Sequence, residues 1–299
     1  MKPSFWSAFL VVAVLGARVE AAPVLSDYVI LAGEKVTVGG GSLVEGLVGT
    51  HYTNAVATQF AITVAGAAAV NGDVRSADNV QLNNGADITG NVIHPAGTTI
   101  NMGAGATIGA DVVADPELPA LPAPSMFSSG GASHTGLGNG ATLTLAPGSY
   151  QDVILGGACT LNLSSGTYYF NDLGAANGLD LVLDLAGGPI AIYVTTRAHF
   201  GSVDVFLPNG GGPADIYLEA QGSGTGTYNA ISAGGGSDWV GTAFAPNGGI
   251  HFGGSSCCST FQGHFWSGKH VDIEHGVNGN GPPVSVEQSD WSTYKSLYR

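Results

Sequence analysis

One short pattern occurs twice in the middle of the chain, as GNGATLTL at residues 138–145 and as GGACTLNL at residues 156–163. After a glycine-rich start, apolar residues alternate with polar ones in both copies, which is typical of a β-strand with one buried face. If the copies stack in register, the leucines point inward and the polar residues point outward. The predicted pairs are Leu143 over Leu161, Leu145 over Leu163, Thr142 over Thr160 and Thr144 over Asn162.

The same spacing continues along the chain. NNGADITGNV at residues 83–92 is echoed by GAGATIGADV at 103–112, and Val74, Val92 and Val112 fall 18 and 20 residues apart. Because helical periodicity is scarce and glycine and asparagine punctuate short strands, we predict an all-β fold, a parallel and right-handed β-helix (solenoid) with rungs of about 18–21 residues. The alternative is a sandwich of antiparallel hairpins. Further strands are expected at 179–185, 190–194, 203–207 and 215–219.

The composition fits such a solenoid and argues against several classes of protein. Glycine makes up 48 of the 299 residues without a strict G-X-Y period, so the chain is not a collagen. Hydrophobic residues reach 44% and charged residues only 10%, which allows a sizeable core. With 8 Lys and Arg and a net charge of −14, the chain lacks the basic clusters that nucleic acids require. Phosphorylated substrates and anionic membranes are disfavoured for the same reason.

The chain divides into five segments. Residues 1–21 combine a lysine, a short apolar stretch and small residues, which predicts a signal peptide; a retained membrane anchor is the alternative. Solenoid parts are expected at 22–114 and 128–281, separated by a Pro-rich linker or strap at 115–127, because proline cannot donate to a sheet ladder. Residues 282–299 form an aromatic tail that either caps the last rung or adds to a neighbouring molecule. No other stretch has the length of a transmembrane segment.

The three cysteines are Cys159, Cys257 and Cys258, an odd number that in an exported protein indicates intermolecular pairing or a free thiol. A disulfide between the adjacent Cys257 and Cys258 stays open, as do reduced thiols. A continuous solenoid places Cys159 about five rungs from Cys257, over roughly 20 Å at ~4.8 Å per rung, which exceeds the ~7 Å that a disulfide spans.

The segment KHVDIEH at residues 269–275 concentrates metal-ligand side chains. If its two aliphatic residues face the core, His270, Asp272 and Glu274 share the outer face. Two histidines and a carboxylate suit a first-row metal ion, so the metal-ligand candidates are His270, Asp272 and His275. The alternative is a solvated strand face without a metal. Two more histidines lie on neighbouring segments, His251 and His264.

Other chemistry has little support in the sequence. Aspartates recur near the expected corners and would suit calcium, but the nonapeptide of calcium-binding β-rolls is absent, so we expect no cofactor. The basic residues of the solenoid body are few (Arg75, Arg197 and Lys269 among them), and no nucleophile motif is present. We therefore predict that the protein is not an enzyme. The aromatic residues considered as a sugar platform or as core are Tyr168, Tyr169, Phe170, Trp239, Phe244, Phe252, Phe261, Phe265 and Trp266.

Over about residues 65–281 the chain resembles a group of secreted, mostly uncharacterised bacterial β-solenoid proteins. The segments that carry the resemblance are GNGATLTLAPGSY, SGTYYF, GGPIAIYV, WVGTAFAPNGGIHFGG and FQGHFWSGKHVDIEHGV. The glycine-cornered rungs resemble polymer-forming solenoids of the bactofilin type. The order of the later segments is similar to that of ice-binding β-solenoid domains in secreted adhesins. The resemblance implies secretion and a solenoid fold.

These observations predict a secreted, non-catalytic structural or adhesive solenoid that self-associates, as a homo-oligomer or polymer, at the cell surface or in the extracellular matrix. Nucleic acid is not an expected partner. The alternative is an ice- or carbohydrate-binding module, which a flat, regular outer face or an exposed aromatic row would distinguish. The Thr142/Thr160 ladder begins such a face, but the next rung offers Asp180 instead. The third hypothesis is a polysaccharide-active β-helix enzyme.

Overall fold

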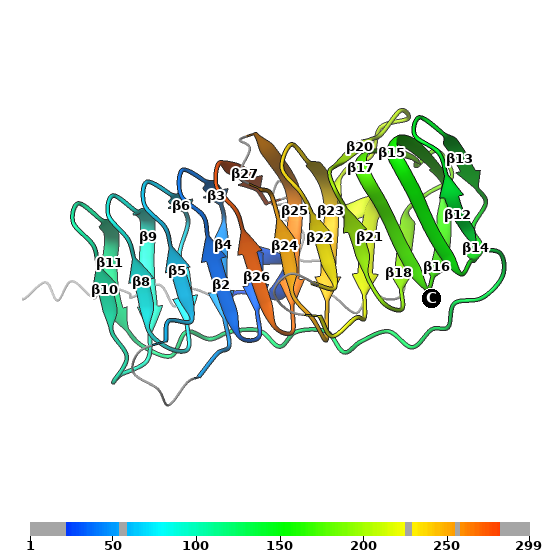
Figure 1. The fold of residues 1–299 in the computed structure, drawn as a ribbon. Coiled ribbons are helices and arrows are strands. Elements are labelled where there is room, and N and C mark those ends of the chain that lie inside the picture. The colour runs from blue at the N-terminus through cyan, green and yellow to red at the C-terminus, as the bar shows by residue number, and fades with distance from the viewer. Residues whose placement is uncertain (1–21, 54–58, 225–228, 255–257, 282–299) are drawn as a thin grey trace, which may run out of the picture.

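The computed structural model describes residues 22–53, 59–224, 229–254 and 258–281, and this part of the chain is an all-β solenoid of about 11 turns (Figure 1). Its 27 strands form one sheet system, and their pairings are parallel. The predicted fold class is therefore confirmed, and the alternative of an antiparallel sandwich is wrong. The predicted signal peptide and the aromatic tail lie outside the described residues.

The strands line up in three columns, named here face A, face B and face C. Face A contains β2 (Lys35–Val38), β5 (Ile62–Val64), β8 (Val80–Leu82), β10 (Ile100–Met102), β12 (His134–Leu137), β19 (Ala198–Phe200), β22 (Ile231–Ala233), β24 (Ile250–Phe252), β26 (His270–Ile273) and the first halves of β15 (Asp152–Ser164) and β17 (Asp172–Asp184). Face B contains β3 (Leu43–Glu45), β6 (Ala69–Asn71), β13 (Thr142–Leu145), β20 (Val203–Phe206), β27 (Val277–Asn280), the second halves of β15 and β17, and the first halves of β9 (Asp87–His94), β11 (Thr107–Val113), β23 (Asp238–Ala245) and β25 (Ser259–Ser267). Face C contains β1 (Tyr28–Ala32), β4 (Leu47–Thr50), β7 (Val74–Ser76), β14 (Gly148–Ser149), β16 (Gly166–Phe170), β18 (Ile190–Val194), β21 (Ile216–Ala220) and the second halves of β9, β11, β23 and β25. Two 3-10 turns, η1 (Leu25–Asp27) and η2 (Pro213–Asp215), lie outside these columns.

The interior is filled by the inward side chains of the three faces, mostly Val, Ile and Leu, which form one continuous core. The predicted stack of 138–145 on 156–163 is confirmed in register: Thr142 pairs with Thr160 and Leu145 with Leu163. The inner leucines are buried, apart from a partly buried Leu143 that packs against the core. One rung cannot bury these side chains alone, so each turn depends on its neighbours.

Glycine allows the sharp turns between faces where a side chain has no room. At Gly263, between the face B and face C halves of β25, φ is +139° and an added Cβ would lie 2.2 Å from the carbonyl oxygen of Gly241 on the previous rung. At Gly46, between β3 and β4, φ is +132° and an added Cβ would meet the Val29 side chain at 2.4 Å. These corners keep consecutive rungs in contact.

The rungs do not stack in chain order. The N-terminal part runs from the middle of the rod to one end, whereas the C-terminal part starts at the other end and returns to the middle (Figure 1). There β25, β26 and β27 pair with β1, β2 and β3. The last rung is therefore paired on both sides, and the ends of the rod are β10–β11 and β12–β14. This differs from the continuous solenoid that the repeat spacing predicts.

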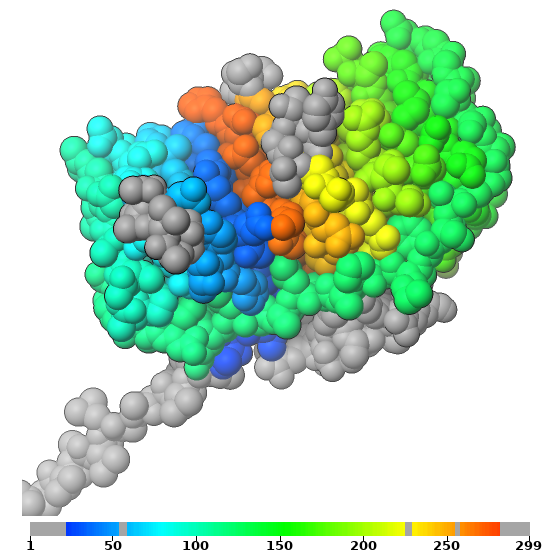
Figure 2. All heavy atoms as spheres, turned by 60° about the horizontal axis from the view of Figure 1, so that its bottom comes forward, coloured from blue at the N-terminus to red at the C-terminus, as the bar shows by residue number. Residues whose placement is uncertain are grey.

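The segment between β11 and β12, residues 114–133, contains no strand and runs along the rod from one end to the other (Figures 1 and 2). We call it the strap. Its Leu118, Leu121 and Phe127 pack on the outside of face C. Near its middle, Ser125 donates from its backbone N–H and its hydroxyl to Glu219, at 2.7 Å each. Glu219 is fully buried and also accepts from Tyr217, at 2.8 Å.

We expect Glu219→Ala to destabilise the protein by about 3 kcal/mol, because it leaves the buried Tyr217 hydroxyl and the half-buried donors of Ser125 without this acceptor. Thermal and urea unfolding followed by circular dichroism measure the change. The control is Asp180→Ala, an exposed carboxylate on face B, which should change stability by no more than about 0.5 kcal/mol. Equal effects of the two substitutions would show that the Glu219 network does not hold the strap.

Candidate functional site

The outside of face C is not available to a ligand along the strap. Its aromatic side chains Tyr193, Tyr217, Phe244 and Trp266 are at most 6% exposed, and Phe127 of the strap packs against Tyr193 with tilted rings at a centroid distance of 5.1 Å. Of the nine aromatic residues considered as a sugar platform or as core, eight are buried, and Tyr169 packs against the same cluster under the strap. None of the nine belongs to an exposed row.

Face B carries an unbroken row of outward positions that runs through every turn. Each member pairs in register with the next across the strand ladder, so neighbours are one rung apart, about 4.8 Å. From one end of the rod to the other, the row is Thr142, Thr160, Asp180, Asp204, Asp238, Thr260, Asn278, Leu43, Ala69, Asp87 and Thr107. As the sequence predicts, Asp180 interrupts the threonine ladder after Thr142 and Thr160. Beyond it the row continues with further aspartates, an asparagine, Leu43, Ala69 and two more threonines.

No basic side chain in the described residues lies on face B. Lys35 is on β2 of face A, Arg75 is on β7 of face C, and Arg197 and Lys269 directly precede two strands of face A. The row is therefore neutral or acidic along its whole length. Its threonines are half-buried or exposed, and so are its aspartates.

Three aspartates follow one another in the middle of this row. Partial burial raises the pKa of Asp204, and the neighbouring carboxylates of Asp238 and Asp180 raise it further. The hydroxyl of Thr260 donates to Asp238 at 2.6 Å and so satisfies one end of the acidic run. In the described part of the chain, the remaining corner aspartates do not come together in a group that could hold a metal ion.

Face A contains a mixed cluster of metal-ligand side chains. His251 of β24 pairs in register with Asp272 of β26, and Glu274 directly follows β26. His251 Nδ1 lies 3.5 Å from Asp272 Oδ2 and 3.8 Å from Glu274 Oε1. The hydrogen bond and the charge of Asp272 raise the pKa of His251 against the opposing effect of burial. Among the described residues, this is the one group of three such side chains whose ligand atoms come close together.

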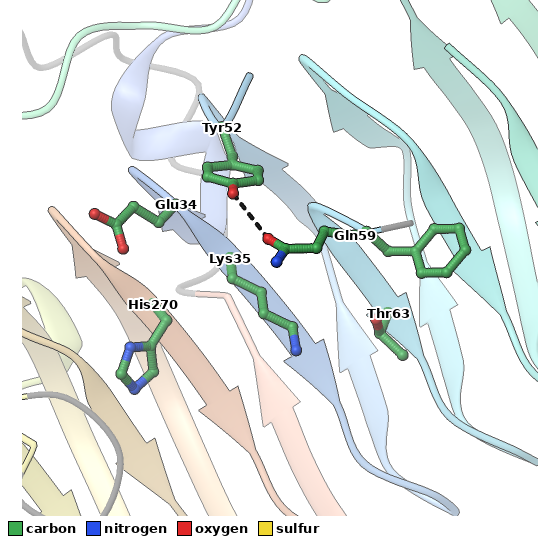
Figure 3. A pocket seen from close by; sticks show the side chains of 7 residues that line it. Glu34, Lys35, Tyr52, Gln59, Thr63 and His270 are labelled. Atoms are coloured by element: carbon green, nitrogen blue, oxygen red, sulfur yellow. Dashed lines mark hydrogen bonds between the residues drawn. The ribbon is translucent and has the colours of Figure 1, made fainter. Parts of the chain in front are cut away.

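The sequence-derived candidates are only partly brought together. Asp272 belongs to the cluster, but His270 does not: its ring lies over Gly249, and burial lowers its pKa. His270 lines a shallow hollow beside Lys35 and Thr63 instead (Figure 3). His275 is exposed and lies against the Gly40–Gly41 turn. His251 takes their place in the cluster. It is brought there by its pairing with Asp272 on the next rung, which the alternation within residues 269–275 cannot predict.

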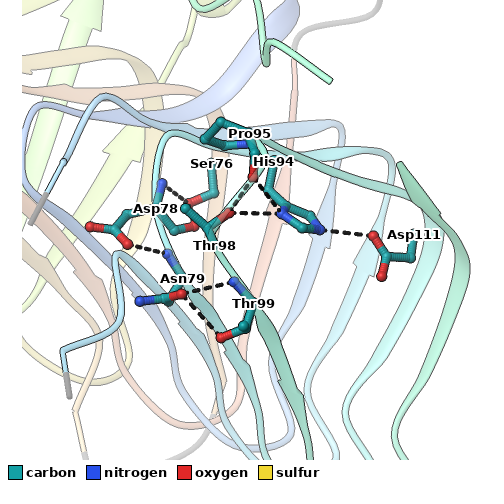
Figure 4. A network of polar contacts seen from close by, with 8 residues as sticks. All are labelled: Ser76, Asp78, Asn79, His94, Pro95, Thr98, Thr99 and Asp111. Carbon is teal, nitrogen blue, oxygen red and sulfur yellow. Dashed lines mark hydrogen bonds and ion pairs between the residues drawn. The ribbon is translucent and has the colours of Figure 1, made fainter. Parts of the chain in front are cut away.

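Two other histidines are structural. His94 is buried near one end of the rod, where Nδ1 lies 2.7 Å from Thr98 Oγ1 and Nε2 lies 2.8 Å from Asp111 Oδ1 (Figure 4). His264 is buried on the outside of face C and stacks on Trp266. Its Nδ1 donates to the Tyr28 carbonyl at 2.9 Å, which ties β25 to the start of β1. Burial lowers the pKa of His264 to about 4.

The structure defines the surroundings of Cys159 most clearly among the three cysteines. Cys159 is a free thiol inside the solenoid, and its Sγ donates to the Gly138 carbonyl at 3.3 Å. Cys258 is exposed and has a positive φ of +83°, while Cys257 lies outside the described residues. The predicted separation of Cys159 from Cys257 therefore stays a prediction.

The fold places the chain in the class of parallel β-solenoids with three faces, of which face C is covered by the strap. No family model and no curated protein sequence matches the chain. Among solved structures it is similar to an ice-binding protein from an Arctic yeast (13% identity, TM-score 0.38, 89% of this chain and 95% of that one) and to an ice-binding protein domain of Shewanella frigidimarina (13%, 0.38, 87% and 95%). A third is an ice-binding protein from an Antarctic biological consortium (16%, 0.34, 86% and 89%). At TM-scores below 0.5, these matches carry no functional conclusion for this chain.

The described residues contain no helix long and apolar enough to cross a membrane.

Acidification should destabilise the protein through His264. The unfolded histidine binds a proton below its ordinary pKa of 6.5, whereas the folded one does so only below about 4. Stability is therefore complete above pH 6.5 and falls as the pH drops towards 4, by about 3 kcal/mol for this residue. Urea unfolding between pH 7 and pH 4 measures this loss.

His264→Gln should flatten that profile relative to the unsubstituted protein. His134→Gln, a partly exposed histidine near the far end of the rod, is the matched control and should leave the profile unchanged. A His264→Gln profile as steep as that of the original protein would contradict the assignment.

Proposed function

We propose that the protein is an exported, non-catalytic ice-binding solenoid and that face B is the surface that contacts ice. The single observation that carries the proposal is the unbroken row of outward positions on face B, in register over every turn of the rod. A crystal surface repeats in space, and a protein face with a fixed repeat can contact many equivalent lattice positions at once. A soluble ligand would need no such length.

The physical properties of face B suit a rigid crystalline partner. The parallel ladder fixes the rung spacing at about 4.8 Å, so the outward side chains are held in position before any contact forms. The threonines of the row are β-branched and stiff at χ1, so little rotamer entropy is lost when they are ordered. Thr142, Thr160, Thr260 and Thr107 combine a methyl group with a hydroxyl that can bond to water.

The carbohydrate alternative is less well supported. Aromatic platforms that stack on sugar rings must be exposed, and the nine aromatic residues considered for this role are buried or packed under the strap. Apart from Phe206, which is 48% exposed on β20, the outward side chains of face B are mostly short and polar. Binding to glycans would use exposed aromatic platforms, whereas binding to ice would use a regular row of short side chains. The row on face B therefore supports ice as the partner.

Replacing small residues of the row by a bulky ring should abolish most of the ice-binding activity. We choose Thr160→Tyr and Ala69→Tyr, which lie in the two halves of face B and project outward. Each ring would hold the face away from a flat surface over several rungs. Thermal hysteresis and capture of the protein by a growing ice surface are the measurements.

The matched control is Thr63→Tyr, the same type of change on face A. It should retain full activity, and circular dichroism should show all three variants folded. Loss of activity in the Thr63 variant alone would move the contact surface to face A, and an unsubstituted protein without thermal hysteresis would overturn the proposal.

The second candidate function is a structural or adhesive role through end-to-end association. The strands at the two ends of the rod, β10–β11 and β12–β14, are paired on one side only in the described structure. Met102 and Val113 at one end are 45% and 61% exposed. Unpaired edges with exposed apolar side chains are prone to add a further strand.

End-to-end association predicts that the apparent mass rises with protein concentration and that Met102→Lys combined with Val113→Lys suppresses this rise, because charges block edge pairing. Sedimentation velocity over a range of concentrations is the measurement. The control is Phe206→Lys, an exposed apolar residue on face B away from the ends. A concentration-independent monomer would remove this candidate.

A further inference from the structure

We propose that His251, Asp272 and Glu274 on face A form a binding site for a first-row divalent cation, with Zn²⁺ the best match. The site lies on a different face from the row discussed above, so the two proposals stand or fall separately. It is not the set that local alternation favours, because His270 and His275 take no part in it.

The backbone brings the three side chains together without strain in the strands. His251 and Asp272 are direct partners in the ladder between β24 and β26, so both project from face A one rung apart. Gly253 stands beside Glu274, with φ +98° and an added Cβ only 3.1 Å from the Glu274 Cβ. The absence of a side chain at position 253 lets Glu274 lie close to His251.

The hydrogen bond between His251 and Asp272 is long, and the distances in the cluster fit a bound cation better than a strong direct contact. His251 Nδ1 is 3.5 Å from one carboxylate and 3.8 Å from the other, whereas His94 and Asp111 form a direct contact of 2.8 Å. Charge-assisted N–H···O bonds are usually about 2.7–2.9 Å long. Ligand atoms at ~2.0 Å from a tetrahedral Zn²⁺ lie about 3.3 Å apart, close to the spacing found here.

The charge and chemistry of the cluster also favour a cation. Two carboxylates face one imidazole nitrogen, which can carry at most one proton for both. Lys269, the nearest basic residue in sequence, is bonded to Glu34 instead. An imidazole ligand favours Zn²⁺ over Ca²⁺, which prefers six to eight oxygens. The side chains are 30–39% exposed, so an ion can enter from solvent.

A bound ion would link two adjacent rungs next to the place where the C-terminal part meets the N-terminal part. Asp272 pairs with Thr37 of β2 on its other side, so the site lies at this junction. The ion should therefore raise the melting temperature, because it binds the folded arrangement and not the separated strands.

The test is calorimetric titration of the tag-free protein with ZnCl₂, CaCl₂ and MgCl₂. We expect one Zn²⁺ per chain and little heat from the other two cations. His251→Asn and Glu274→Gln should each weaken Zn²⁺ binding at least tenfold. His270→Asn and His275→Asn are the matched controls, histidines from the same segment that should leave the affinity unchanged.

A second measurement separates binding from folding. Zn²⁺ should raise the melting temperature of the unsubstituted protein and of the His270→Asn variant, but not that of His251→Asn, whose circular dichroism should remain that of the folded solenoid. The proposal is overturned if the unsubstituted protein shows no saturable Zn²⁺ binding. It is equally overturned if His270→Asn or His275→Asn weakens binding as much as His251→Asn does.

Discussion

The pairing of the last rung with the first is the interaction on which the architecture depends. Three ladders make this junction, β1 with β25, β2 with β26 and β3 with β27, one on each face. Without it, two short solenoids would each expose an additional open end. The strap must then cover the whole rod, and its length allows this: about 20 residues reach roughly 65 Å, against roughly 50 Å for about 11 rungs.

The junction also makes the outer faces continuous. On face B the row passes from Asn278 of the C-terminal part to Leu43 of the N-terminal part without a break in register. On face A, Asp272 pairs with Thr37 across the same boundary. His264 and Trp266 both donate to the Tyr28 carbonyl there, so side chains hold the position that the backbone ladders define. A long contact surface therefore depends on two remote parts of the chain meeting in register.

Much of this fold could be predicted from the sequence, because a repeat of about 18–21 residues with alternating apolar positions determines which residues stack. The pairs of 138–145 with 156–163 are confirmed residue by residue. The spacing did not predict the order of the rungs, since a remote rung offers the same alternation as the next one. The repeat also did not predict the register shift between Ile108 and Ala110. Because of this shift, Val92 pairs with Asp111 rather than with Val112.

The candidate metal site shows the same limit. Alternation correctly placed Asp272 outward, but its partner His251 lies on the previous rung, and the identity of that partner depends on the exact length of the turn between them. His264, also on a neighbouring segment, lies on the outside of face C, where its Nδ1 donates to the Tyr28 carbonyl. Aromatic content gave no indication of exposure either, because the strap that covers Tyr193 and Trp266 is remote in sequence.

The three faces differ in what covers them and in the charges that they carry. Face C buries its aromatic side chains under the strap and so contributes to stability, whereas this strap cluster includes no side chain of face A or face B. On face B, three adjacent aspartates repel one another, and the pKa of Asp204 is raised first by its partial burial and then by this repulsion. They divide the row into a threonine pair at one end and a longer, less charged stretch from Thr260 onward. The longer stretch crosses the junction, so the less charged part of the row depends on the register in which the two parts of the chain are joined.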